Sequence, residues 1–598
     1  MDDKNFPRRT FSNILKFNEM KIKNILLKSK LLYIIGFIIF SCNACNDLDL
    51  APLSSGSTDN WFSSNEEFDM HLNHLYDLSY WTDAFFHSGF IDLRTDDMIR
   101  RDMVNDVSSG SVSSTTGWVD VLWNLRYRAI QNANRIIGQL ESVEGISEEN
   151  KLRYEAEAKF HRAANYSKLI FHWGDVPFYN NVLSVEEAFS LSRKDKYEIL
   201  EEIYNDFDFA AAHLPLTYSE LKRATKGAAL ALKARIALYM EDYSVAHDAA
   251  KAVMDLGVYE LYPEYQDLFS SFVKPTDEII FGVPRSSAFE DGSNIGGQSD
   301  WPTTRTPGGF NVVSPSWQLL ASFLCTDGLP IDESPLFDPQ EPFKNRDPRC
   351  SKIIVAFGSE LDGITYEPHP DSLMVYNSNS GQYVLNLDTR GNHAFAGFNG
   401  LTYRKWVNGE LVQKWIGRLA DPYNIVIRYA DVLLIYAEAK IELGDIDQSV
   451  LDAINSVRER AYKQSEMPYP EVTTLSQDEL RKQLRFERRM EFGFEGVRRY
   501  NDLIRWRLAE KVINMPTYGL LADPDDIREK LVKPGLWFWG DTPPIDEDGI
   551  AHFEETEMYN EGRIRKLANR NWPDRQYLWP IPSSEIKINE NLVQNPGY

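Results

Sequence analysis

The chain has 598 residues, of which 43% are hydrophobic and 26% are charged. This composition is enough to bury a large core, so the chain as a whole is not intrinsically disordered. It contains 64 Lys and Arg against 89 Asp and Glu, a formal net charge of −25, which argues against binding to the phosphate backbone of nucleic acid.

The first apolar run covers residues 31–40 and follows a lysine-rich segment, residues 20–30. Ten residues are too few to cross a bilayer, which needs about 20. A basic segment followed by a short apolar one is typical of a secretory signal. We therefore predict a signal peptide over residues 1–41, with Met20 as an alternative start.

Two cysteines follow this segment directly. Small residues precede Cys42 and Cys45, a pattern that resembles the lipobox of bacterial lipoproteins, in which the cysteine is acylated. The residues before Cys42 fit better, and Cys45 is the alternative. Several acyl chains would anchor the protein stably. Residues 42–60 are polar and Ser-rich, so we predict a flexible tether. Removal of residues 1–41 would change the formal charge to −30.

Apolar residues then recur at spacings of three and four, which predicts helices. The predicted helices span residues 118–140, 151–172, 195–213, 224–240 and 244–256. Gly174 and Pro177 give a stop signal after the second. Segments 239–257 and 441–460 each contain an acidic turn and then a helix with small residues on one face, as in helical hairpins of tetratricopeptide type.

Residues 257–420 are rich in Pro, Gly, Ser, Asn and aromatic residues. We predict loops with short hairpins there, including strands at 278–284 and 352–357. A second irregular stretch spans residues 514–572. Long irregular segments on a helical scaffold usually carry the binding surface. Cys325 and Cys350 also remain, and the sequence leaves open whether they pair or stay as buried thiols.

Seven segments together resemble a known family. The clearest are RYADVLLIYAEAK (428–440), RFERRMEFGFEGVRRYNDLIRW (485–506) and YLWPIPSSEIKINENLVQNPGY (577–598). Segments 156–178, 223–240, 326–331 and 345–350 also fit, and all seven occur in the family's order. Over almost its whole length after the signal segment, the chain resembles the SusD/RagB-family outer-membrane lipoproteins.

The resemblance implies a mainly α fold, in which tetratricopeptide-like helical hairpins form a scaffold with long irregular loops and a few short β-hairpins. It divides the chain into an N-terminal helical region, 61–256, and a C-terminal region, 257–598, with the loop-rich insert 257–420. It also implies a surface-exposed outer-membrane lipoprotein that binds glycan and delivers it to a TonB-dependent, SusC-like transporter. No enzyme activity and no cofactor are implied. Calcium occurs in some relatives, but no cluster of ligands predicts it here.

Segment 485–506 has an apolar stripe, with charged residues of opposite sign between its members at spacings of three and four. Such pairs are typical of a solvated, salt-bridged helix face, which we predict here. The apolar stripe consists of Phe486, Met490, Phe494 and Val497. The prolines of segment 577–598 predict an extended tail that packs back over the helices.

The sequence contains no HExxH motif, no Gly-rich phosphate loop and no GxSxG motif. His71 and His74 have Asp69 and Asp77 nearby, but this spacing is also that of an ordinary amphipathic helix. We therefore predict no metal site and no catalytic residue.

A glycan site needs aromatic rings that stack on sugars and planar polar side chains that bind hydroxyl groups. We predict that Trp81 and Trp301 stack on sugar rings. The polar partners predicted with them are Asn294, Asp300 and Arg305. Since large aromatic residues are mostly buried, the alternative for each Trp is a place in the core.

Charge bears on the kind of glycan. Arg100 and Arg101 would suit acidic sugars. The acidic composition weakly disfavours a polyanionic ligand, although a local basic patch would override this.

We therefore expect a glycan-binding protein that is not an enzyme. Two alternatives stay open, a helical protein-interaction scaffold without a small ligand and a surface glycoside hydrolase. Burial of both Trp81 and Trp301 would favour the scaffold. A hydrolase would need a carboxylate pair about 5–10 Å apart across a cleft. The sequence does not identify the glycan.

Overall fold

The computed structural model describes residues 62–81, 91–218, 223–270, 276–283, 303–407, 424–465 and 467–598. Residues 64–598 form one compact unit. The predicted signal segment and tether, with Cys42 and Cys45, lie outside the described residues. The same holds for three residues of the predicted glycan site, Asn294, Asp300 and Trp301.

The N-terminal part is helical. Its helices are α2 (Asn65–Leu75), α3 (Leu78–Trp81), α4 (Gly117–Leu140), α5 (Glu148–Trp173), α6 (Val185–Ser190), α7 (Lys196–His213), α8 (Lys226–Tyr239) and α9 (Tyr243–Asp255). The five predicted helices are confirmed as α4, α5, α7, α8 and α9. Helix α5 ends at Gly174, whose φ of 76° is readily adopted only by glycine.

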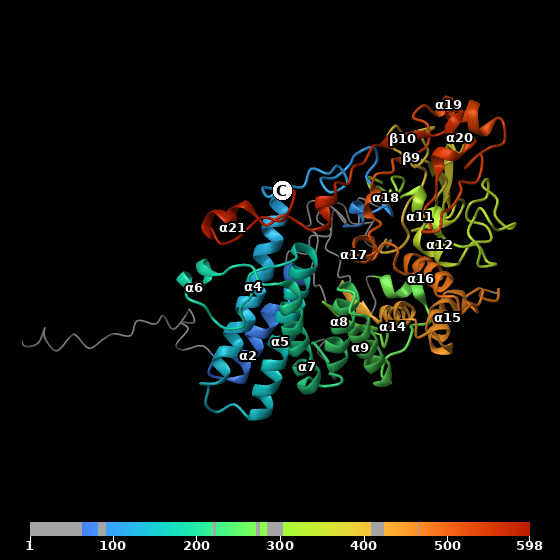
Figure 1. Cartoon of the computed structure of the whole chain (residues 1–598). Helices are drawn as coiled ribbons and strands as arrows, with labels where there is room; N and C mark the ends of the chain where they lie inside the picture. Colours follow the sequence, from blue (N-terminus) through green and yellow to red (C-terminus); the bar gives the residue numbers. More distant parts are fainter. Residues whose placement is uncertain are drawn as a thin grey trace, which may run out of the picture. The chain divides into compact units, whose positions relative to one another are not determined.

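The long helices pack in a row. Helix α4 packs on α5, α5 on α7, α7 on α8 and α8 on α9. Helix α14 (Tyr429–Leu443) follows on α9 and also contacts α15 (Gln448–Tyr462) and α16 (Gln477–Phe492). Figure 1 shows this row from cyan α4 through green α8 and α9 to orange α14 and α15. The small residues predicted to line α9, among them Ala246 and Ala250, are fully buried. The helical-hairpin scaffold is thereby confirmed.

The strands are short and antiparallel. Strand β1 (Met98–Ile99) pairs with β3 (Ser314–Pro315), β2 (Ile279–Val283) with β8 (Asn424–Arg428), and β9 (Thr517–Gly519) with β10 (Arg565–Ala568). A four-stranded meander consists of β4 (Glu360–Leu361), β5 (Ile364–Thr365), β6 (Met374–Asn377) and β7 (Gln382–Leu385).

One predicted strand is confirmed and one is wrong. Segment 278–284 contains β2. Segment 352–357 is not a strand, because its first residues belong to helix α12 (Arg349–Ile353) and Ile354 makes only a single bridge, to Tyr403. The Asp347 carboxylate accepts the backbone N–H of Arg349 at 2.9 Å and so stabilises the start of this helix.

The remaining elements are short apart from α17. They are η2 (Ile91–Arg94), η3 (Tyr265–Phe269), α11 (Trp317–Ser322), α17 (Val497–Arg505), α18 (Ala509–Ile513), α19 (Pro524–Ile527), η5 (Arg528–Val532), η6 (Phe553–Glu555), α20 (Glu557–Asn560), η7 (Asp574–Tyr577) and α21 (Ser583–Ile588). Within the ranges given above, no helix is long and apolar enough for a bilayer crossing. Cys325 and Cys350 are buried thiols without a disulfide.

Most charged residues of segment 485–506, among them Glu487, Arg489 and Glu491, lie inside the protein, so the predicted solvated helix face is wrong. Arg428, fully buried, donates to carboxylates of Glu278, Glu491 and Glu495 at 2.6–2.7 Å. A buried charge is tolerated when it is paired and hydrogen-bonded, and other segments supply these partners. Although burial alone would raise it, Arg428 and Lys405 lower the pKa of Glu495 to about 2.

The carboxyl-terminal segment packs on the helices, as predicted. The Trp579 ring stacks on His172, with centroids 4.0 Å apart, and its Nε1 donates to the Tyr500 hydroxyl at 2.9 Å. Trp173 Nε1 donates to the Pro580 carbonyl at 3.0 Å. The segment is not extended throughout, because α21 lies within it.

Candidate functional site

The candidate site is a surface that we name the arginine surface. It contains Arg305 of the predicted glycan set, and it is built from four segments far apart in the sequence: the 98–105 loop, residues 303–310, residues 386–398 and strand β10. Its members are Arg101, Arg305, Arg390, Arg565, Phe310, Phe395 and Phe398.

The segment before the 98–105 loop is anchored by the buried charges. Arg489 of α16 donates to Asp96 and Asp97, each at 2.7 Å, and Arg499 of α17 donates to Asp96 at 2.8 and 2.9 Å. Burial alone would raise the pKa of Asp96, but the two guanidinium groups hold it below its usual range. The family-like segment 485–506 therefore fixes the base of the loop that carries Arg101.

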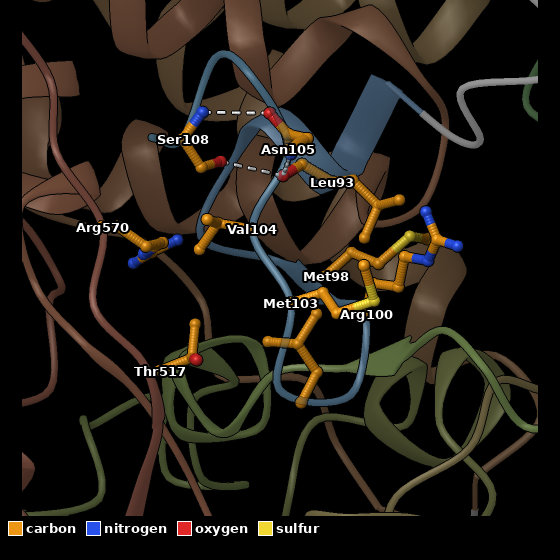
Figure 2. Close-up of a pocket in the computed structure, with 10 residues that line it drawn as sticks. Leu93, Met98, Arg100, Met103, Val104, Asn105, Ser108, Thr517 and Arg570 are labelled. Carbon is orange, nitrogen blue, oxygen red and sulfur yellow. Dashed lines mark hydrogen bonds between the residues drawn. The ribbon is translucent and has the colours of Figure 1, made fainter. Parts of the chain in front are cut away.

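The loop itself is tightly folded. Asn105 Nδ2 and Ser108 Oγ both donate to the Leu93 carbonyl, at 2.5 and 3.2 Å (Figure 2). The Met103 N–H donates to the Arg100 carbonyl at 2.9 Å and closes a turn. Arg101 lies in this turn with a φ of 46°, a conformation uncommon for residues other than glycine.

A small cavity of about 30 Å³ lies against this loop, lined by Met98, Arg100 and Arg570 among others (Figure 2). It has room for one or two water molecules and is too small for a sugar ring. A glycan at this site would therefore bind on the open surface.

Two arginines of the arginine surface share one acceptor. Arg101 Nη2 and Arg305 Nη1 both donate to the Phe310 carbonyl, at 3.0 and 2.8 Å. The pKa of Arg101 is lowered by burial and then by the charge of Arg305. Two positive charges are thus held side by side next to an exposed ring, because Phe310 is 41% exposed.

The segment that carries Arg305 is held by Asp388. This buried carboxylate accepts the backbone N–H groups of Arg305 and Thr306, at 2.6 and 3.0 Å, and the Thr306 hydroxyl at 2.6 Å. Burial raises the pKa of Asp388. Arg101 also lies over the Phe395 ring, 5.1 Å from its centroid, and Phe395 is 53% exposed.

A second arginine pair lies over one ring. The guanidinium groups of Arg390 and Arg565 are each 5.1 Å from the centroid of Phe398. Arg390 donates to the Ala522 carbonyl at 2.6 and 3.1 Å. Burial, and next the neighbouring Arg565, lower the pKa of Arg390 to about 10.

Trp81 is not in this surface. It is 4% exposed, its Nε1 donates to the Leu75 carbonyl at 3.0 Å, and its ring packs on Phe160 and Phe281. The prediction that Trp81 stacks on a sugar is therefore wrong, because the core covers its ring. The cavity of about 70 Å³ beside it holds a few water molecules at most.

Among the described residues, one cluster has potential metal-ligand atoms within 4.8 Å of one another, His552, Glu554 and Glu555. Both ring nitrogens of His552 already contact carboxylates, Nδ1 that of Glu554 at 3.0 Å and Nε2 that of Asp546 at 3.1 Å. Burial lowers the pKa of His552, but these carboxylates raise it more. Because both ring nitrogens of His552 face carboxylates, we describe the cluster as a hydrogen-bonded histidine–carboxylate group.

The arrangement can bind planar acceptors and ring faces. Guanidinium groups donate to carboxylates, sulfates and hydroxyls, and exposed phenyl rings offer apolar faces. Of these residues, sequence reasoning named Arg101 and Arg305. It missed Arg390, Arg565 and the three phenylalanines, because no motif or periodicity marks them within the irregular segments.

Comparisons with known proteins match this fold. The sequence model described as "SusD family" matches residues 277–598, and the one described as "Starch-binding associating with outer membrane" matches residues 48–238. SusD-like protein P25 of Formosa agariphila is 27% identical over 562 residues, which cover 86% of this chain and 95% of that protein. The starch-binding protein SusD of Bacteroides thetaiotaomicron is 24% identical, over 77% of this chain and 75% of that protein. The crystal structure of a SusD-like carbohydrate-binding protein from Bacteroides fragilis superposes with a TM-score of 0.72 at 27% identity, over 89% of this chain and 99% of that one.

Proposed function

The chain belongs to the SusD family, and from this premise we propose that it is a surface-exposed outer-membrane lipoprotein that binds an oligosaccharide and delivers it to a TonB-dependent transporter. The observation that carries the binding role is the arginine surface. There two exposed rings, Phe310 and Phe395, lie beside the guanidinium groups of Arg101 and Arg305. Rings and planar donors together are what recognition of a sugar requires.

The proposal includes no catalytic step. Similarity to carbohydrate-binding proteins supports a binding role, and the arginine surface is cationic, whereas glycoside hydrolysis uses a pair of carboxylic groups. Incubation of the protein with the glycan that it binds should release no shorter sugars. Release that persists after further purification would favour the hydrolase alternative.

The transporter role is tested by co-purification. We would extract outer membranes in a mild detergent with an affinity-tagged full chain and identify the proteins that remain bound. We expect a TonB-dependent barrel in stoichiometric amount. Recovery of the chain alone, under conditions that preserve a known complex of this kind, would count against a stable transporter partner.

The lipid anchor is tested by metabolic labelling with an alkyne fatty acid. We propose Cys42 as the acylated residue. Cys42→Ala should abolish labelling and Cys45→Ala should not. The reverse result would move the anchor to Cys45, and labelling in both single variants would contradict a unique acylated cysteine.

The alternative is a helical scaffold that binds a protein and no glycan. Burial of both Trp81 and Trp301 would favour it, and of the two only Trp81, which is buried, lies among the described residues. Screening of the purified full chain on a glycan array separates this alternative from the proposal. A glycan that binds with a Kd in the micromolar range supports the proposal. Co-purification of a protein partner, with no glycan bound, would support the scaffold.

A further inference from the structure

The arginine surface is a local excess of positive charge. Arg101, Arg305, Arg390 and Arg565 come from four separate segments, and Asp102 is near three of them, since its charge acts on Arg101, Arg390 and Arg565. The fold thereby gathers four guanidinium groups around the turn that follows β1.

Within the described part of the chain, none of these guanidinium groups forms a salt bridge, although Asp102 acts on three of them and Asp388 acts on Arg305 from a longer distance. In this part of the chain, no carboxylate oxygen lies within 4.0 Å of a guanidinium nitrogen of Arg101, Arg305, Arg390 or Arg565. The four guanidinium groups donate to backbone carbonyls instead. The nearby Asp388 is engaged by three donors from residues 305 and 306.

In the core of the same protein, several arginines are paired with carboxylates. Arg349 donates to Asp347, Glu487 and Glu491 at 2.6–2.9 Å. Arg428 and Arg460 are similarly paired, whereas the buried Arg346 donates to backbone carbonyls. Like charges held together without a counter-charge cost free energy, and such arrangements cluster at functional sites. At the arginine surface, four guanidinium groups lie close together beside exposed rings and none has a salt-bridge partner among the described residues, which points to an anion that comes from outside.

The Arg101–Arg305 pair is suited to such an anion. Both groups donate to the same oxygen, the Phe310 carbonyl, at 3.0 and 2.8 Å. Their donor nitrogens therefore lie close to each other. A sulfate or carboxylate has several acceptor oxygens that adjacent guanidinium groups can share. The exposed rings of Phe310 and Phe395 lie next to this pair and offer apolar surface to the ring that carries the anion.

We propose that the arginine surface binds an anionic saccharide, with a sulfate ester or a uronate carboxylate on Arg101 and Arg305 and the sugar ring against Phe310 or Phe395. This inference rests on the proposed glycan-binding function and specifies its ligand class. Arg390 and Arg565 extend the positive surface along the saccharide.

The test measures binding of the full chain to an array of sulfated, uronate-containing and neutral oligosaccharides. We expect anionic members to bind and their affinity to fall as salt is raised from about 0.05 to 0.5 M, because ions screen exposed charges. Binding of only sulfated or only uronate members identifies the anion. If the bound glycans are neutral and their affinity does not depend on salt, the inference is wrong while the glycan-binding function stands. If no saccharide binds, both the inference and the proposed function are contradicted.

Charge variants locate the site. The double variant Arg101→Gln/Arg305→Gln should weaken anionic binding at least about tenfold. Arg101→Lys/Arg305→Lys should restore part of the affinity, because the charge returns without the planar donors. The matched control is Lys251→Gln in α9, where Lys251 forms an exposed pair with Asp255. Figure 1 shows α9 in the helical row at the lower edge of the fold, away from β10 at the upper right.

Folding is controlled by the thermal transition, which should be within a few degrees of wild type in every variant used. The salt dependence is measured on the unaltered protein and does not depend on any variant folding. Equal anionic affinity of the wild type and the double Gln variant would place the ligand elsewhere and overturn the proposal.

Discussion

The role that the sequence predicts for Trp81 differs from the role that the structure gives it. In the sequence it lies in an irregular segment, beside Tyr80 and close to Phe85 and Phe86. In the structure it joins two core elements, since it packs on Phe160 of α5 and Phe281 of β2. Its Nε1 donates to the Leu75 carbonyl inside the core.

Trp81→Ala is therefore expected to lower stability and not to affect ligand recognition directly. Removal of a buried aromatic ring costs about 3–5 kcal/mol, which urea denaturation measures. Phe395→Ala is the control, because this ring is 53% exposed and should cost less than about 1 kcal/mol. A Trp81→Ala variant of unchanged stability would contradict the core assignment.

Asp92 is a second residue whose state the sequence does not predict. It is 2% exposed, and its Oδ2 accepts the Gly496 N–H at 3.3 Å. Burial, and next the charge of Asp97, raise the pKa of Asp92 from 3.8 to about 8. The folded protein thus keeps a proton that the unfolded chain has lost.

The sign of the pH effect follows. Between pH about 4 and about 8 the folded state binds more protons than the unfolded state at this position, so the contribution of Asp92 to stability falls as pH rises. Asp92→Asn stays neutral and lacks this fall. As the pH rises from 5 to 8, we expect the difference in free energy of unfolding between Asp92→Asn and the wild type to shift in favour of the variant by more than about 1 kcal/mol. Stability curves that stay parallel over this range would rule out the raised pKa.

Helices α16 and α17 act together as an anchor for the arginine surface. Arg489 and Arg499 fix Asp96 and Asp97, and the Tyr403 hydroxyl donates to the Asp97 carbonyl at 3.0 Å. The turn with Arg101 begins only a few residues later. Sequence reasoning predicted a helix face in segment 485–506 but placed its charges in water, because spacings of three and four are the same for exposed and buried pairs.

Arg489→Met should therefore destabilise the protein strongly and loosen the 98–105 loop. Loss of one partner leaves buried carboxylates unpaired, at about 3–5 kcal/mol. Arg481→Gln is the control on the same helix, because its pair with Glu442 is partly exposed and is worth about 1 kcal/mol or less. Chemical denaturation gives the stabilities, and limited proteolysis reports the loop. Equal losses in the two variants would contradict the anchoring role.

For the chain as a whole, local pattern predicted the scaffold and not the site. The helix end at Gly174 could be predicted because three or four consecutive residues determine it. The pairing of Arg101 with Arg305 could not, since more than 200 residues separate them and only the tertiary fold brings them to one carbonyl. The strand predicted at 352–357 was wrong because the Asp347 contact that starts a helix there is not visible as periodicity.

The carboxyl-terminal segment is integral to the whole fold. Asn595 Nδ2 donates to the carbonyls of Trp173 and Trp579, at 2.9 and 2.7 Å, and Trp579 is 3% exposed. We expect a chain that ends at residue 576 to be degraded or aggregated, because α5 then exposes the apolar surface that Trp579 covers. A chain that ends at residue 596 keeps these contacts and should fold. Soluble, cooperatively melting protein from the shorter chain would contradict this.

The pairing of the buried charges also affects the electrostatic field through which a ligand approaches the protein. Buried cations and buried anions in the described core are nearly equal in number, so this core contributes little to the net charge of −25. An anionic saccharide would approach through a repulsive field and then reach a small attractive patch. Salt would weaken both the long-range repulsion and the attraction at the arginine surface. A higher salt concentration should therefore accelerate association and also accelerate dissociation. A receptor of this kind would capture its ligand slowly at low salt and exchange it quickly at high salt.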